Sequence, residues 1–168
     1  MLSNLISVPV MLVLSVLQMT VISRINFLNG SADLILLAVA AWGIREKNSN
    51  AFIWALVGGL MISIATAMPS FSPLAPYIFT ALIARLFSKR LWQAPIMALI
   101  ITTVAGTIFQ HIFYISLLQI TGIPLDFAES VGNVTLPSLL LNFFFLFPVY
   151  VIIGDIWKWV TPEEMYAY

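Results

Sequence analysis

Long apolar runs, interrupted only by short polar segments, constrain this chain more than any other feature of its sequence. Only 8% of the residues are charged and 61% are hydrophobic, whereas a soluble domain has about a quarter of its residues charged. The chain cannot form a water-facing shell, so the sequence predicts an integral membrane protein. The formal net charge is zero, so the chain has no excess of positive charge that would favour binding to nucleic acid. The chain has no cysteine, which excludes disulfides, thiolate metal sites and cysteine catalysis.

The apolar runs predict an all-α, polytopic membrane protein whose six transmembrane helices form a single domain over residues 1–168. The expected spans are residues 4–22, 33–44, 51–68, 74–87, 94–120 and 136–157. A span needs about 20 mostly apolar residues, and the second run covers only about 18 Å. We expect that helix to be short, barely tilted, or sheltered by its neighbours. No basic residue precedes the first run and no small-residue cleavage site follows it, so we interpret it as an uncleaved span.

The basic residues test whether the short second run crosses the membrane. With six spans and an inside N-terminus, the basic residues on the inside are Arg45, Lys47, Arg85, Lys89, Arg90 and Lys158. Only Arg24 lies outside, as the positive-inside rule requires. Without the second crossing, Arg45 and Lys47 would move outside. The sequence therefore predicts six crossings with both termini in the cytoplasm, and it places Asp126 and Glu129 in the longest outer loop.

A few polar side chains lie within the apolar runs and are the candidates for function. They are Gln18, Asp33, Gln110, His111 and Asn142. Asp33 begins the second helix, where its carboxylate can cap free N–H groups, and proton or ion handling is the alternative. His111 is more consistent with a hydrogen bond between helices than with a haem, chlorophyll or zinc ligand, because no second ligand accompanies it. Gln18 and Asn142 are expected to make contacts between helices.

No constellation in the sequence predicts catalysis or a cofactor. There is no carboxylate pair at membrane depth, no nucleophile with an orienting histidine and no phosphate-binding glycine loop. The two halves of the chain show no internal repeat, which disfavours ion-coupled transport. We therefore expect a protein that is not an enzyme and that holds neither a metal nor a cofactor.

The third run contains a ridge of small residues at every fourth position. These residues are Ala51, Ala55, Gly59, Ser63 and Ala67, with Gly58 alongside. Small residues let helix backbones approach closely in lipid, where no hydrophobic force draws helices together. The ridge therefore predicts a packing surface, either against another helix of the same chain or against a partner protein.

Three stretches together resemble the bacterial rod shape-determining protein MreD family. They are LQMT at 17–20, SADLILLAVAAWGI at 31–44 and WALVGGLMISIATAMP at 54–69. The similarity covers roughly residues 10 to 90, and the remainder matches in hydropathy only. The chain departs from the family pattern at two positions, where Ala32 replaces a proline and Ser63 replaces an acid.

The resemblance implies a non-enzymatic subunit of the peptidoglycan elongation machinery, which controls cell shape from the bacterial inner membrane. It further implies in-membrane binding to an MreC-like partner and a fold similar to the six-helix substrate-binding subunits of energy-coupling-factor transporters. Two alternatives stay open. One is a vitamin-binding transporter subunit, and the other is a structural subunit of a respiratory or photosynthetic complex.

Overall fold

The computed structural model describes residues 2–25, 29–45, 51–69, 71–91 and 93–161, and these contain helices and no β-strand element. Lys47 lies outside these residues. The longer helices are α2 (Ser7–Thr20), α3 (Leu34–Arg45), α4 (Ala51–Ala65), α5 (Leu74–Arg90), α6 (Pro95–Ile120) and α8 (Leu136–Val160). The short elements are α1 (Leu2–Leu5), η1 (Ile22–Arg24), α7 (Phe127–Ser130) and the π-helical turn η2 (Val131–Thr135). Each of the six predicted spans therefore contains one of the six longer helices, as expected.

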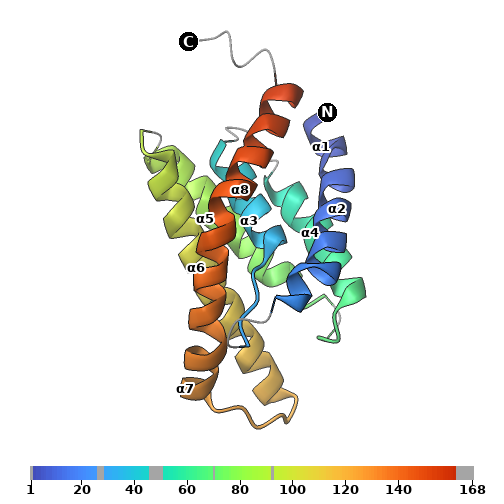
Figure 1. Cartoon of the computed structure of the whole chain (residues 1–168), viewed down its shortest axis with the longest axis vertical. Helices are drawn as coiled ribbons and strands as arrows, with labels where there is room; N and C mark the ends of the chain where they lie inside the picture. Colours follow the sequence, from blue (N-terminus) through green and yellow to red (C-terminus); the bar gives the residue numbers. More distant parts are fainter. Residues whose placement is uncertain (1, 26–28, 46–50, 70, 92, 162–168) are drawn as a thin grey trace.

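Three helical segments are long and apolar enough to cross a membrane. They are Ser7–Arg24, Pro95–Ile120 and Phe127–Val160, while α3 and α4 are shorter apolar helices. The start of α1 and the end of α8 lie at the same end of the bundle (Figure 1). These features are compatible with a membrane protein.

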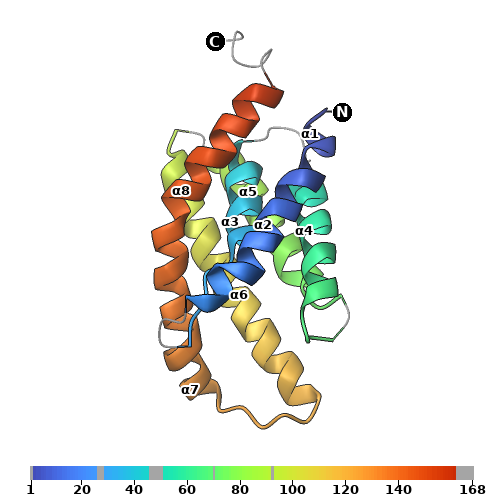
Figure 2. The ribbon, with the colours of Figure 1, turned by 45° about the vertical axis from the view of Figure 1, so that its right-hand side comes forward.

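The short helix α3 lies at the centre of the bundle and is enclosed by the other helices (Figures 1 and 2). Every residue from Leu34 to Ile44 is buried. It packs against α2, α4, α5, α6 and α8. A helix that is apolar on all sides is stable only where other elements cover its whole circumference. The neighbours thus shelter α3, which was one of the explanations expected for its length.

The peripheral helix α2 shows the opposite pattern, because only one narrow stripe of it is covered. Its buried residues are Ser7, Met11 and Ser15, which recur every four positions. Val10 and Leu14 beside this stripe are partly buried. Exposed apolar side chains occupy most of the remaining surface of α2, and a similar exposed stripe follows α8 through Leu140, Phe144 and Phe147. In a bilayer such faces contact lipid at no cost, since lipid tails are as apolar as leucine.

The small residues of α4 pack against helices of the same chain. A Cβ atom at Gly58 would lie 2.5 Å from the Ile35 side chain of α3, and one at Gly59 would lie 2.7 Å from the Leu74 side chain of α5. Ala51 and Ala55 are buried. The Ser63 hydroxyl donates to the Gly59 carbonyl 2.6 Å away.

The prediction that the ridge of small residues extends to Ala67 is wrong. The helix α4 stops at Ala65, so Ala67 lies beyond it and is exposed. Pro69 follows two residues later and cannot continue a helix. The buried small residues of this surface therefore run from Ala51 to Gly59.

Candidate functional site

The first turn of α3 is held by the carboxylate of Asp33. Its Oδ1 atom accepts a hydrogen bond from the Leu36 backbone N–H at 2.9 Å. This is the N-cap geometry, in which a side-chain oxygen three residues back satisfies an N–H group that has no partner within the helix. The carboxylate also lies at the positive end of the helix dipole. The capping interpretation of Asp33 agrees with this geometry.

The other oxygen of the same carboxylate joins two further helices. Oδ2 accepts hydrogen bonds from the Tyr77 hydroxyl of α5 at 2.9 Å and from the Gln110 amide of α6 at 2.6 Å. Both donor residues are almost fully buried. A charge-assisted hydrogen bond is about twice as strong as a neutral one. One side chain thus ties together α3, α5 and α6.

Two amide side chains satisfy the remaining polar groups at the start of α3. Asn142 of α8 accepts from the Asp33 N–H at 2.7 Å and donates to the Thr107 hydroxyl of α6 at 2.8 Å. Gln18 of α2 accepts from the Leu34 N–H at 2.9 Å and donates to the Ala32 carbonyl at 2.6 Å. The N–H groups of Asp33, Leu34 and Leu36 at the start of this buried helix are thereby paired.

A seventh residue brings the segment before α3 onto α8. The Ser138 hydroxyl accepts from the Ser31 N–H at 3.0 Å. Gly30 makes this approach possible, because a Cβ atom there would lie 2.6 Å from Pro137. We call the resulting set the Asp33 network. Its members are Gln18, Asp33, Tyr77, Thr107, Gln110, Ser138 and Asn142.

Four of the five polar candidates from the sequence meet in this network, although they lie far apart along the chain. The fifth, His111, lies beside it, with its Nδ1 atom 3.1 Å from the Thr135 hydroxyl. Sequence reasoning missed Tyr77, Thr107 and Ser138. Hydroxyl side chains are common in membrane helices, so nothing in the sequence distinguishes these three.

A small pocket borders the network on the side of α6. Its volume is about 170 Å³, and its polar lining includes Gln18, Asp33, Gln110, His111, Tyr114 and Ser138. Within the described part of the chain, no three His, Cys, Asp or Glu residues lie close enough together to hold a metal ion. The pocket has room for water molecules or a small polar group, since ligands of drug size occupy about 300–1,000 Å³.

We expect His111→Leu to weaken folding by about 1 kcal/mol through loss of its contact with Thr135. The absorption spectrum of the purified protein should not change, because the contact of Nδ1 with the Thr135 hydroxyl is the role that we assign to this histidine. Unfolding in detergent and visible absorption test both expectations. The loss of a coloured band in the variant would show instead that His111 holds a pigment or haem.

No protein-family model, curated protein or solved structure matches this chain. The segments 17–20 and 31–44 meet in the fold. Gln18 of the first stretch bonds to Ala32 and Leu34 of the second. Ala32 is buried and accepts a hydrogen bond through its carbonyl, and the Ser63 hydroxyl bonds to its own helix.

Proposed function

We propose that the chain is a non-enzymatic membrane subunit that resembles MreD and acts as a scaffold for the peptidoglycan elongation machinery. The observation that carries the proposal is the contact of Gln18 with Ala32 and Leu34, which joins two of the resembling stretches. Residues that define a family by short motifs are expected to share a structural task. Here that task is to hold the start of the central helix α3.

The Asp33 network also favours a scaffold over the alternatives. Both carboxylate oxygens of Asp33 accept from donors of the same chain. The pocket beside Asp33 measures about 170 Å³, below the range of about 300–1,000 Å³ for ligand sites, so the network itself does not offer a vitamin site. His111 bonds to Thr135 through its Nδ1 atom, and the absorption spectrum distinguishes this contact from a ligand role at Nε2. The exposed faces of α2 and α8 are left for lipid and for other membrane proteins.

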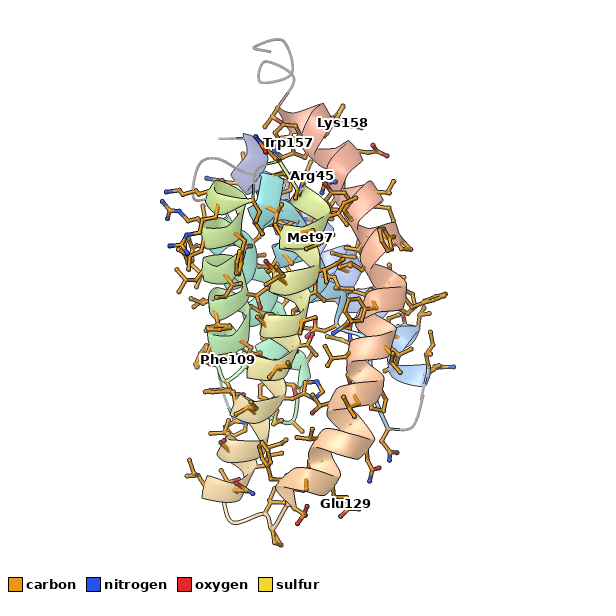
Figure 3. The ribbon with its side chains drawn as sticks, turned by 90° about the vertical axis from the view of Figure 1, so that its left-hand side faces the viewer. Arg45, Met97, Phe109, Glu129, Trp157 and Lys158 are labelled. Atoms are coloured by element: carbon orange, nitrogen blue, oxygen red, sulfur yellow. The ribbon has the colours of Figure 1, made fainter. Side chains whose placement is uncertain are left out.

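The proposal includes an orientation with both termini in the cytoplasm of a bacterium and six helices across its inner membrane. Arg45 and Lys158 lie at one end of the bundle, and Glu129 lies at the opposite end (Figure 3). The Arg45 guanidinium lies 3.5 Å from the centre of the Tyr150 ring. The end with more basic residues is placed inside by the positive-inside rule.

Copurification tests the proposal. The tagged full chain, extracted from its own host in mild detergent, should carry an MreC-like protein and cell-wall synthesis proteins with it. Depletion of the chain should make rod-shaped cells round. A vitamin bound in stoichiometric amount would favour the transporter subunit, and a coloured respiratory or photosynthetic complex would favour the third class. Either result without cell-wall proteins would overturn the scaffold proposal.

A further inference from the structure

Two helices of the bundle are longer than a membrane is thick. The helix α6 has 26 residues and the continuous segment Phe127–Val160 has 34 residues, which correspond to about 39 Å and 51 Å. The hydrocarbon core measures about 30 Å, and an average tilt of about 20° takes up little of the excess. Both helices continue past the ends of α2, α3 and α4 at the end opposite to Lys158 (Figures 1, 2 and 3).

The part that extends beyond the other helices is a hairpin. About 20 residues from the basic end of each long helix, 95–114 and 141–160, fill the hydrocarbon core, which leaves approximately residues 115–140 beyond it. We call these residues the α6–α7 hairpin. It comprises the last turns of α6, the connecting loop, α7, η2 and the first turn of α8. In the proposed orientation this hairpin stands at the outer membrane surface.

In the proposed orientation, the tip of the hairpin exposes large apolar side chains beyond the hydrocarbon core. Ile120 is 83% exposed, Ile123 is 47% exposed and Phe127 is 48% exposed. Burying such side chains against a partner would stabilise the complex by about 25 cal/mol of free energy for each Å² of apolar surface removed from water. Contiguous exposed apolar residues that are bordered by polar groups are typical of protein interaction sites.

Next to these side chains lies an acidic pocket of about 330 Å³. Asp126 and Glu129 line it together with Asn29, Ser130 and Asn133. The Asp126 Oδ1 atom accepts from the Glu129 N–H at 2.8 Å, which leaves its second oxygen available. The sequence contains neither Lys nor Arg from residue 91 to residue 157. Among the described residues, the one ion pair joins Lys158 to Asp155 at the other end of the bundle.

We propose that the α6–α7 hairpin docks a basic, apolar segment of a partner protein at the outer membrane surface. This inference rests on the proposed scaffold function and names the chemistry of the partner. A lysine or arginine of that segment enters the pocket between Asp126 and Glu129. Its apolar neighbours cover Ile120, Ile123 and Phe127. Charge complementarity sets the choice of occupant, because the hairpin carries two carboxylates and no cation of its own.

The test uses the full chain in nanodiscs of zwitterionic phosphatidylcholine. The probe is a fluorescent peptide of alternating lysine and leucine, with a glutamate–leucine peptide of equal length for comparison and empty nanodiscs to subtract membrane binding. The lysine peptide should bind the wild-type chain, and the double variant Asp126→Asn, Glu129→Gln should bind it about tenfold more weakly. Asparagine preserves the helix cap, so the hairpin keeps its fold. Raising the salt concentration should reduce the difference.

Two further variants separate charge from apolar contact. Asp155→Asn removes an exposed acid at the opposite end and should leave peptide affinity unchanged. Ile123→Ser should weaken binding at low and at high salt, because apolar contact is not screened.

Equal binding of the two peptides, or equal affinity of wild type and double variant, would overturn the proposal. Self-association of the wild-type chain that the double variant abolishes would also overturn it, since a second copy would then occupy the hairpin. Copurification with cell-wall proteins that persists in the double variant would place the partner contact elsewhere and leave the scaffold function intact.

Discussion

Replacing Asp33 with alanine is expected to lower the free energy of unfolding in detergent by about 3 kcal/mol or more. The substitution removes the acceptor for the Leu36 N–H, the Tyr77 hydroxyl and the Gln110 amide. Each of these donors would then be left without its partner in a largely buried place, where an unpaired polar group costs about 1–3 kcal/mol. Titration with a denaturing detergent, followed by tryptophan fluorescence, measures the change.

Two variants serve as controls for the Asp33 prediction. Asp33→Asn keeps an oxygen for the helix cap and loses the negative charge, so it should fall between wild type and Asp33→Ala. Asp155→Ala removes a carboxylate that is 69% exposed and pairs only with Lys158 in the described part of the chain, so stability should change by less than about 1 kcal/mol. If Asp33→Ala and Asp155→Ala proved equally stable, the network would not hold the bundle together.

Replacing Gly59 with leucine is expected to destabilise the bundle by about 3 kcal/mol. A Cβ atom alone would lie 2.7 Å from the Leu74 side chain and 3.2 Å from the Leu74 Cα atom. The backbone of α5 cannot move away as a flexible side chain can, so α4 and α5 must separate. Leucine has a better helix propensity than glycine, but this offsets only about 1 kcal/mol of the loss. Detergent unfolding and gel filtration of the purified variant measure the effect.

The neighbouring residue provides a matched control for Gly59. Leu60 is 43% exposed on the outer side of α4, so Leu60→Ala removes side chain that contacts lipid and should cost less than about 1 kcal/mol. Both variants change one residue within the same turn and differ in the face that they alter. Equal stability and equal assembly of the two variants would remove support for close packing at Gly59.

The helices could be predicted well from the order of apolar and polar residues along the chain, because polar and charged residues mark the ends of the apolar runs. The expected span 33–44 agrees with α3 at Leu34–Arg45, and 94–120 agrees with α6 at Pro95–Ile120. The error at Ala67 has a local cause. The spacing of small residues continued to this position, but α4 ended at Ala65 before Pro69. Periodicity describes which residues would share a face of a helix, and it does not state where the helix stops.

The candidate site could be predicted only as separate residues. Polarity within apolar runs identified Gln18, Asp33, Gln110 and Asn142 one by one. Their convergence depends on how α2, α6 and α8 pack around the start of α3, which no spacing along the chain encodes. Tyr77 was missed because tyrosine in a membrane helix also commonly faces the lipid headgroups, so its presence does not predict a buried hydrogen bond.

The sequence by itself indicated a membrane protein, its helical segments and the presence of a short second helix. These follow from local properties, namely hydropathy, charge and the lengths of the apolar runs. The tertiary structure decided that the carboxylate of Asp33 is shared by α3, α5 and α6. It also decided that Gly58 and Gly59 face different helices. Such pairings arise because each buried polar group and each bare backbone surface must find its partner across helices, and that choice is made only when all of them pack together.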